Sequence, residues 1–339
     1  ELHDGEAVSP DYDTPAYRAE LDSWFAALGL VWHWLPITLT NLGEQLEVVQ
    51  TQGRSGKDLV LNLCDGDEIH GYPGRSVVLA LEQAGLPFTG AASTFYEATT
   101  YKAAMKERLM AAGVATPPFV RLTGTDADLE CLAEAVGFPA LVKPEVSAAS
   151  VGIGLRSLVF DAESAAAQFA RLTQGAGGER FLASGVIAER FVDGPEYTAL
   201  VVAGRVYPVV ERVFHSALPP HERFLSYDRY WSAYQEESRL PEGEPFYRYA
   251  LASPSRQEEL APLAQRAFAA LSGTGYARVD IRVQSRTNQP YVLEVNANCG
   301  LSGDTETSVG QILRLTGSSM PGLLSEILED GLARAGVSR

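Results

Sequence analysis

One stretch near the C-terminal end limits what this chain can fold into more than any other part of its sequence. Residues 278–283 alternate apolar and polar side chains, and we interpret residues 291–296 as a second arm with the same period of two. Residues 285–290, between them, are polar and include a proline. This pattern predicts a β-hairpin, and symmetry about Thr287 would fix which residues lie opposite one another.

That register places charge where charge is costly. Asp280 would face Glu294, and Arg278 would face Asn296, all on one side of the hairpin, provided that no bulge interrupts the ladder. Two carboxylates directly opposite one another repel. A cation between them would remove the repulsion, and Asp, Glu and Asn oxygens suit Mg²⁺ better than zinc. The alternative is a solvated hairpin face with scattered charges.

Lysine is rare in this chain. Lysine and arginine together number 27, of which four are lysines and 23 are arginines. A lysine kept in such a chain suggests a need for a compact ammonium that binds phosphate as a point charge, although codon bias explains Lys57 and Lys106 equally well. Lys143 is different, because it ends the apolar run 138–142 and precedes a small-residue loop, 147–154, whose backbone amides could approach phosphate.

Six short motifs follow one another in order between about residues 59 and 330. Each is weak alone, but the ordered set is specific for a fold and for ATP. The motifs are Thr100-Tyr-Lys102, Leu141-Val-Lys143-Pro144, Ser150-Val-Gly152-Ile153, Ala188-Glu189-Arg190 continuing to Glu196, Arg278-Val-Asp280, and Leu293-Glu294-Val-Asn296 followed by Gly300. Together they resemble the ATP-grasp superfamily and, within it, the D-alanine–D-alanine ligases and their relatives.

The resemblance implies an α/β chain with α+β lobes: a three-lobed ATP-grasp fold whose nucleotide site lies between the central and C-terminal lobes. The expected domains are an N-terminal domain at 1–95, a central subdomain at 96–185 and a C-terminal subdomain at 186–339 with the metal site. Apolar periodicity predicts helices at 15–28, 75–84, 100–112, 126–136, 161–172 and 321–335, and a buried strand at 59–63. Residues 214–253 show no periodicity and are expected to form a lid, with Arg229 and Tyr230 nearest to the family's lid Lys–Tyr pair.

The implied activity is ATP-dependent joining of a carboxylate, an amino acid, to an amine through an acyl phosphate, with release of ADP and phosphate. The cofactors would be ATP and two Mg²⁺ ions. Residue-for-residue matches assign catalysis to Arg278, Lys143 and Ser150; nucleotide binding to Lys102, Lys143, Ser150, Gly152, Glu189, Arg190, Val192 and Glu196; metal binding to Asp280, Glu294 and Asn296; and substrate contacts to Glu68, Arg278, Gly300 and Ser308.

Departures from the family pattern fall on the substrate side. Ala149 stands where the family has the first of two serines, and Asn62 or Cys64 stands where it has a histidine. Cys299 replaces the proline that follows the metal-binding asparagine. We therefore favour specificity altered from D-alanyl-D-alanine, in secondary metabolism. The alternatives are a D-alanine–D-alanine ligase of cell-wall synthesis, a ligase of a non-amino-acid carboxylate, and a non-catalytic ATP-binding regulator such as the synapsins.

Composition agrees with small-molecule partners. A formal charge of −16 and a pI near 4.8 argue against nucleic acid or an anionic membrane as a partner. Three cysteines without metal-binding spacing are expected as free thiols in a reducing compartment. The sequence shows no signal-like start and no apolar run long enough to span a membrane, so a cytoplasmic location is expected. The resemblance leaves a homodimer open.

Overall fold

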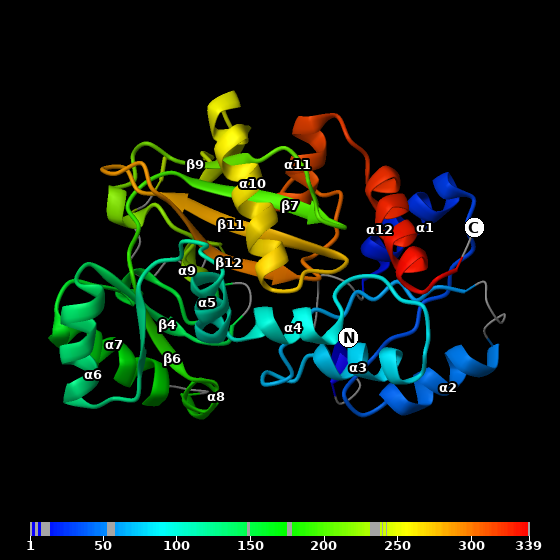
Figure 1. Ribbon diagram of the computed structural model, residues 1–339, viewed down its shortest axis with the longest axis horizontal. Coiled ribbons are helices and arrows are strands. Elements are labelled where there is room, and N and C mark those ends of the chain that lie inside the picture. The colour runs from blue at the N-terminus through cyan, green and yellow to red at the C-terminus, as the bar shows by residue number, and fades with distance from the viewer. Residues whose placement is uncertain are drawn as a thin grey trace.

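The computed structural model describes residues 2–3, 6–7, 14–52, 58–147, 150–174, 178–230, 238, 240–241 and 243–337 (Figure 1). Among the helices of these residues, none is both long and apolar enough to cross a membrane. The α-helices are α1 (Pro15–Leu28), α2 (Leu42–Gln52), α3 (Arg75–Gln83), α4 (Ser93–Thr100), α5 (Lys102–Ala111), α6 (Asp126–Cys131), α7 (Ala162–Gln174), α8 (Gly178–Ser184), α9 (Tyr227–Tyr230), α10 (Pro254–Ala270), α11 (Ser308–Thr316) and α12 (Met320–Arg334). The strands are β1 (Leu2–His3), β2 (Glu6–Ala7), β3 (Phe119–Leu122), β4 (Ala140–Pro144), β5 (Leu158–Val159), β6 (Val186–Arg190), β7 (Glu196–Val202), β8 (Arg205–Val206), β9 (Val210–Phe214), β10 (Tyr247–Leu251), β11 (Tyr276–Val283) and β12 (Pro290–Ala297).

The larger sheet has six antiparallel strands in the order β10-β9-β7-β11-β12, with β8 beside β7. Val279, Ile281 and Val283 of β11 are buried on one face of this sheet, which α10 covers (Figure 1). Period-two alternation turns the residues between them to the opposite face. That face carries Arg278, Asp280 and Arg282, so burying the apolar side of β11 positions the candidate site residues on the other.

The smaller sheet, at the end of the molecule with α6, α7 and α8, has the antiparallel order β3-β6-β4-β5 (Figure 1). Its core forms from alternate residues of β4 and β6 and from apolar residues of α7 and of the π-helical turn Leu132–Val136. β6 pairs with β3 and β4. The expected boundary at residue 186 would assign β6 to the C-terminal subdomain, whereas its pairing places it in this smaller sheet; the domain limits stay a prediction.

Helix α5 lies between the two sheets, in contact with β12 on one side and β3 on the other. Lys102, Met105 and Leu109 are buried on this helix, in agreement with the expected apolar face. The helix begins at Lys102 rather than at Thr100, because Thr100 ends the preceding helix α4.

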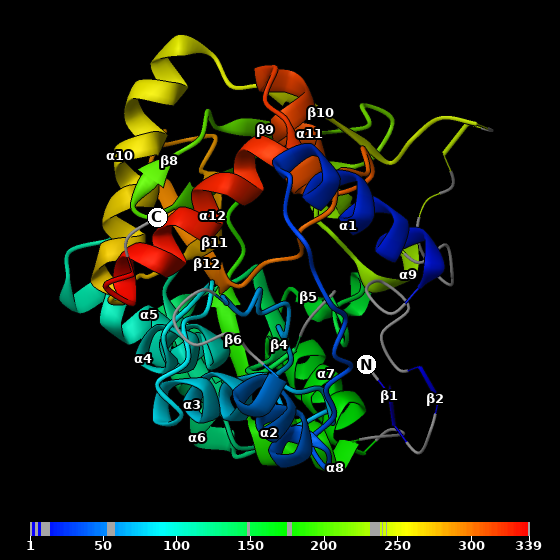
Figure 2. The same cartoon turned by 90° about the vertical axis from the view of Figure 1, so that its right-hand side faces the viewer.

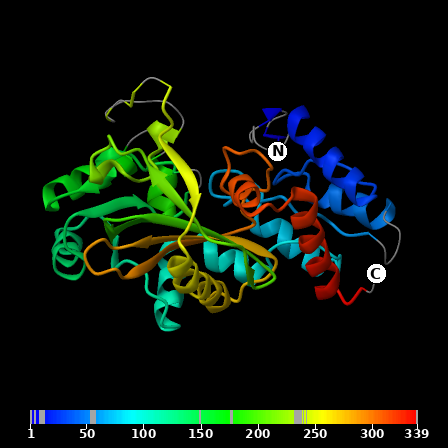
Figure 3. The same cartoon turned by 90° about the horizontal axis from the view of Figure 1, so that it is seen from above.

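The opposite end of the molecule joins the first and last helices. Figure 2 and Figure 3 show α1 beside α12, and residues from both helices share one apolar core. The side chain of Thr14 accepts a hydrogen bond from the backbone N–H of Tyr17 at the start of α1, and Gly29 ends the helix in the left-handed conformation. The bounds predicted for α1 are therefore confirmed.

The strand predicted at 59–63 is wrong. Within the described residues, this segment pairs only at one parallel bridge, between Val60 and Phe88. Side chains satisfy the next backbone amides: Thr89 Oγ1 accepts from the N–H of Asn62 at 3.1 Å, and Asn62 Oδ1 accepts from the N–H of Cys64 at 3.1 Å. These side-chain hydrogen bonds occupy backbone amides that a sheet ladder would otherwise use, so the strand pairing ends here.

Candidate active site

The hairpin formed by β11 and β12 has the predicted pairs. Asp280 lies opposite Glu294, and Arg278 lies opposite Asn296. The amide Nδ2 of Asn296 is 3.3 Å from Asp280 Oδ2 and 3.3 Å from Glu294 Oε1. Two carboxylates and one amide therefore converge on one face of the large sheet.

This donor set fits a hard cation. A half-turn of the Asn296 amide exchanges its nitrogen for its oxygen, which would give three oxygen ligands of the kind that Mg²⁺ prefers. Thr198 Oγ1 on β7 donates to Asp280 Oδ1 at 2.7 Å and so fixes one carboxylate oxygen. The other oxygen, Oδ2, lies 2.9 Å from Nη2 of Arg278. Burial alone would lower the pKa of Arg278, but Asp280 beside it raises that pKa above its usual value.

A bulge sits next to the Asp280–Glu294 pair. Ile281 pairs with Val292 rather than with Leu293, so Leu293 is the extra residue of β12. The strict alternation predicted for this arm is therefore wrong. Val292 and Val295, three residues apart, are both in the core, while Glu294 faces the site. Between the turn and the bulge, pairs such as Ile281 with Val292 are one residue away from the predicted symmetry about Thr287. The extra residue shifts the register by one, so the bulge itself brings Glu294 opposite Asp280.

Three lysines and one glutamate gather where helix α5 lies between the two sheets. Lys143 Nζ is 2.5 Å from Glu189 Oε1, and Lys106 Nζ is 2.8 Å from Glu189 Oε2. Lys102 Nζ donates to the carbonyl of Ser147 at 3.1 Å. Burial lowers the pKa of Lys102, and the charge of Glu294 partly offsets that shift. Lys102 thus lies near enough to both Lys143 and Glu294 for their charges to shift its pKa, whereas Lys57 lies outside the described residues.

Lys106 was not among the predicted site residues. It is fully buried and shares Glu189 with Lys143. Its sequence spacing carried a signal: Lys106 is four residues after Lys102, so both lie on one face of α5. Without the structure, a lysine on such a face is equally well explained as one that extends its ammonium to solvent.

Glu189 should make stability depend on acid pH. Burial would raise the pKa of Glu189, but Lys106 and Lys143 lower it from 4.5 to about 2. Because the pKa is lower in the folded state, this stabilisation is complete above pH 4.5 and is lost as pH falls toward about 2. We expect Glu189→Gln to lose less unfolding free energy than the wild type over that interval. Urea unfolding at pH 5, 4 and 3 measures the difference, and equal losses in the two proteins would contradict it.

The loop after Lys143 approaches the strand that carries it. Ser150 and Gly152 both have positive φ angles, 60° and 79°. A Cβ added to Gly152 would lie 2.7 Å from Pro144 Cγ, so only glycine fits there without displacement. The backbone N–H of Tyr227 donates to the carbonyl of Ile153 at 2.8 Å, which ties the expected lid to this loop. The phosphate contacts expected of Ser150 and Gly152 stay predictions, and Ala149 lies outside the described residues.

The residues predicted to bind adenosine have partners of their own. Arg190 donates its backbone N–H to the carbonyl of Pro118 at 2.9 Å, and the carbonyl of Val192 accepts from Arg282 Nη1 at 3.1 Å. Glu196 is buried and forms ion pairs with Arg212 and Arg282. Their roles in reading adenine and ribose, like that of Glu189, stay predictions.

The segment expected to be a lid contains regular structure. Residues 247–251 form strand β10, which pairs with β9, so the expectation of an aperiodic segment up to residue 253 is wrong. The strand forms because Tyr249 packs in the core and accepts a hydrogen bond from Arg212. Arg229 is buried 2.8 Å from Glu222 Oε2. The guanidinium is therefore held within the lid segment, while the side chain of Tyr230 lies outside the described residues.

The predicted substrate residues lie on three different elements. Glu68 Oε1 accepts from the N–H groups of Gly74 and Ser76, at 3.3 and 2.5 Å, and so caps α3. Gly300 is exposed after the end of β12, and Ser308 is the first residue of α11. These substrate roles stay predictions, and the cap gives Glu68 a structural one.

Asn298 joins the end of the hairpin to two segments from the first hundred residues of the chain. Its side chain is buried; Oδ1 accepts from the N–H of Ala91 at 2.8 Å, and Nδ2 donates to the carbonyl of Cys64 at 3.3 Å. Asn298 has a φ of 50°, a conformation that asparagine adopts more readily than most residues. The segment around Cys64 is thereby fixed to the strand that ends in the predicted metal ligands.

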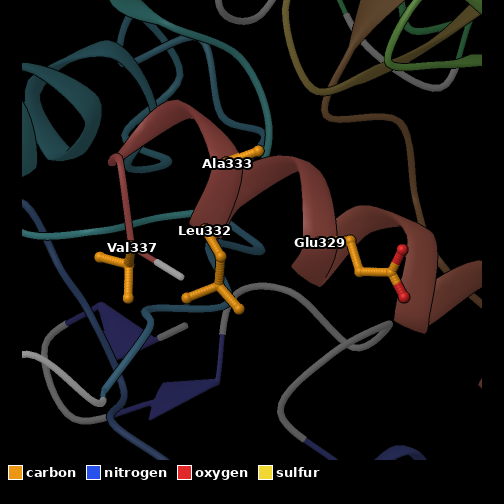
Figure 4. Close-up of a pocket in the computed structure, with 4 residues that line it drawn as sticks. All are labelled: Glu329, Leu332, Ala333 and Val337. Atoms are coloured by element: carbon orange, nitrogen blue, oxygen red, sulfur yellow. The ribbon is translucent and has the colours of Figure 1, made fainter. Parts of the chain in front are cut away.

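Two surface pockets lie elsewhere. One, of about 240 Å³, is lined by Glu329, Leu332, Ala333 and Val337 near the end of α12 (Figure 4). The other, of about 600 Å³, is lined by residues that include Leu251, Pro254 and Leu315. Neither lining includes a predicted site residue, so the candidate site is defined by its converging polar side chains.

Comparison with known proteins identifies the family. Residues 109–329 match the family model described as D-ala D-ala ligase C-terminus. The D-alanine–D-alanine ligase of Synechococcus sp. (strain JA-2-3B'a(2-13)) is 30% identical over 315 residues, 88% of this chain and 86% of that protein. That of Laribacter hongkongensis is 29% identical over 265 residues, 77% and 76% of the two chains.

Solved structures agree on the fold. The D-alanine–D-alanine ligase from Bacillus anthracis complexed with ATP superposes with a TM-score of 0.67 and 20% identity, over 97% of this chain and 96% of that one. A second structure of the Bacillus anthracis enzyme, whose name does not mention ATP, superposes with a TM-score of 0.65. The chain therefore belongs to the D-alanine–D-alanine ligase family of ATP-dependent ligases, with the ATP-grasp fold.

Proposed function

We propose that this ATP-dependent ligase joins an amino acid to an amine with specificity altered from D-alanyl-D-alanine. A substrate carboxylate oxygen would attack the γ-phosphorus of ATP, releasing ADP and leaving an acyl phosphate. The amine nitrogen would then attack the acyl carbon, losing a proton as phosphate leaves. The observation that supports this most is the convergence of Arg278, Asp280, Glu294 and Asn296 on one face of the hairpin.

The chemistry requires neutralisation of negative charge, because an anionic carboxylate must approach a polyanion. Asp280, Glu294 and Asn296 would hold Mg²⁺, which when bound neutralises the ATP phosphates. Lys102 and Lys143 add buried positive charge beside this set. Arg278 would hold the acyl phosphate and the oxyanion that follows it.

Altered specificity is supported by the residues around the predicted substrate end. Cys299, where the family pattern has proline, is buried next to Asn298. Burial raises the pKa of the Cys299 thiol to about 12, which makes it neutral at physiological pH. The second candidate is a D-alanine–D-alanine ligase, which is favoured by the names of the most similar relatives.

One assay separates these candidates. The purified protein is incubated with ATP, Mg²⁺ and pairs of amino acids, among them D-alanine with D-alanine, while nucleotide products and amides are measured. We expect ADP and phosphate in equal amounts, with the highest kcat/KM for a pair other than two D-alanines. A preference for two D-alanines would refute altered specificity, AMP as the product would refute the acyl-phosphate route, and ATP binding without turnover would favour a regulator.

A further inference from the structure

We propose that Lys106 is a positioning residue of the nucleotide site: it shares Glu189 with Lys143 and holds the bulge of β12 behind Glu294. This inference rests on one part of the proposed function, the assignment of Lys143 to the ATP phosphates, and not on the identity of the ligated substrates. It concerns a residue that would not itself touch the nucleotide.

The first support is the hydrogen-bonding capacity of the Lys106 ammonium. An ammonium has three donors, and Lys106 Nζ has three partners. They are Glu189 Oε2 at 2.8 Å, Thr116 Oγ1 at 2.9 Å and the carbonyl of Leu293 at 3.3 Å. The side chain is 0% exposed. Two hydrogen bonds and one ion pair therefore hold the buried Lys106 ammonium within the protein.

The second support is charge. Glu189 binds Lys143 through one carboxylate oxygen and Lys106 through the other, so the three side chains carry a net charge of +1. With Lys143 alone, Glu189 would form a neutral pair, and a phosphate would have to compete with a buried carboxylate for that ammonium. At low dielectric such competition is costly. Lys106 compensates Glu189 and so makes Lys143 available to phosphate.

The third support is the bulge. Leu293 is the extra residue of β12, and its carbonyl turns toward Lys106 on α5. The next residue, Glu294, carries one of the two predicted metal-binding carboxylates. A buried lysine usually costs more than an apolar residue of similar size. A buried lysine at position 106 is explained if its ammonium holds Glu189 of the small sheet and the Leu293 carbonyl of the large sheet in place.

The test compares ATP binding by the full chain in four forms. Lys106→Met removes the charge, and with it both hydrogen bonds and the ion pair, whereas Lys106→Gln keeps a donor for Thr116 or Leu293 without the charge. Thr116→Val is the matched control, because it perturbs the same buried spot and leaves both ion pairs. Dissociation constants are measured by calorimetry in EDTA and again with Mg²⁺, and thermal unfolding is followed in parallel.

We expect Lys106→Met and Lys106→Gln to weaken ATP binding in EDTA by about tenfold to a hundredfold, the size of a lost charged contact. Thr116→Val should change it by less than about threefold. With Mg²⁺, Lys106→Met should lose more affinity than Lys106→Gln, because only Met leaves the Leu293 carbonyl without a donor. Wild-type affinity in both Lys106 variants, or an equal loss in Thr116→Val, would overturn the inference.

A rescue experiment excludes a purely structural role. Binding of inorganic tripolyphosphate, which has no adenine, is compared in Lys106→Met and in Lys106→Met/Glu189→Gln. Replacing Glu189 as well should restore at least about tenfold of the lost affinity, because no carboxylate then competes with the phosphate for the Lys143 ammonium. Absence of rescue would overturn the charge argument. These assays need no turnover, so failure to ligate any amino-acid pair would refute the proposed function and leave this inference standing.

Discussion

Asp280→Asn should reduce kcat by at least about 10³-fold, and Glu294→Gln should do the same. Each substitution removes one charge from the predicted metal site and keeps the shape of the side chain. A metal ion that neutralises phosphate charge contributes several kcal/mol to a transition state, and each 1.36 kcal/mol is a factor of ten in rate. Steady-state release of phosphate at saturating ATP and Mg²⁺ measures the effect.

Thr198→Val is the graded control for that pair. It removes the hydrogen bond that Thr198 donates to Asp280 but leaves both carboxylate charges, so a loss of roughly tenfold or less is expected, equivalent to about one hydrogen bond. Asp280→Asn also removes the ion partner of Arg278, so thermal unfolding must show that the variant is folded. Glu294 is half-buried and keeps the test valid if Asp280→Asn is unstable. Near-normal turnover in folded Glu294→Gln would show that the metal assignment is wrong.

Arg278→Ala should lose amide formation by at least about 10²-fold, comparable to removal of one oxyanion donor. Its affinity for ATP should change little, because Arg278 is assigned to the acyl phosphate formed after phosphate transfer. The guanidinium is paired with Asp280, and the Arg278 side chain as a whole is 26% exposed, so it is not closed off from solvent. Parallel measurement of phosphate and amide should show phosphate release exceeding ligation, as the unheld acyl phosphate reacts with water.

Arg278→Lys separates charge from geometry in the same assay. Lysine keeps the positive charge but cannot form a two-pronged contact with an oxyanion. We expect an intermediate loss of amide formation and retained affinity for ATP. Normal ligation by Arg278→Ala would remove this residue from the proposed chemistry.

The hairpin itself could be predicted from sequence, because the alternation of β11 and the polar turn at 285–290 both indicated it. The structure confirms the pairs of Asp280 with Glu294 and of Arg278 with Asn296, but the pairs nearer the turn are one residue away from the predicted symmetry, and the bulge makes up the difference. Repulsion between two facing carboxylates then supplied the reason to expect a cation.

Two features of the same region could not be predicted. Tyr291, Val292 and Leu293 are three consecutive apolar residues that break the alternation of this arm, but the break does not show which of them is the extra residue. The role of Lys106 depends on contacts with Glu189 and Leu293, which are 83 and 187 residues away in the chain. Pattern analysis compares near neighbours, so it could place Lys106 on a helix face but could not identify its partners.

The error at residues 59–63 has a different cause. The apolar run suggested a buried strand, but Asn62 binds the backbone locally and Thr89 binds it from the neighbouring segment. Side-chain competition of this kind depends on rotamers and neighbours that composition does not reveal. The helices were easier to predict, because caps such as Thr14 and Gly29 act within a few residues.

The bulge at Leu293 also affects which mutations the hairpin of this enzyme can accept. Loss of one codon within a strand normally turns every later side chain to the wrong face. Here, a chain without Leu293 would place Val292 directly before Glu294 and restore an unbroken alternation. Val292 would stay in the core, Glu294 would stay opposite Asp280, and only the carbonyl that binds Lys106 would be lost. At this position an in-frame deletion would therefore remove one contact of Lys106 and leave the predicted metal-binding residues on the same face of the sheet.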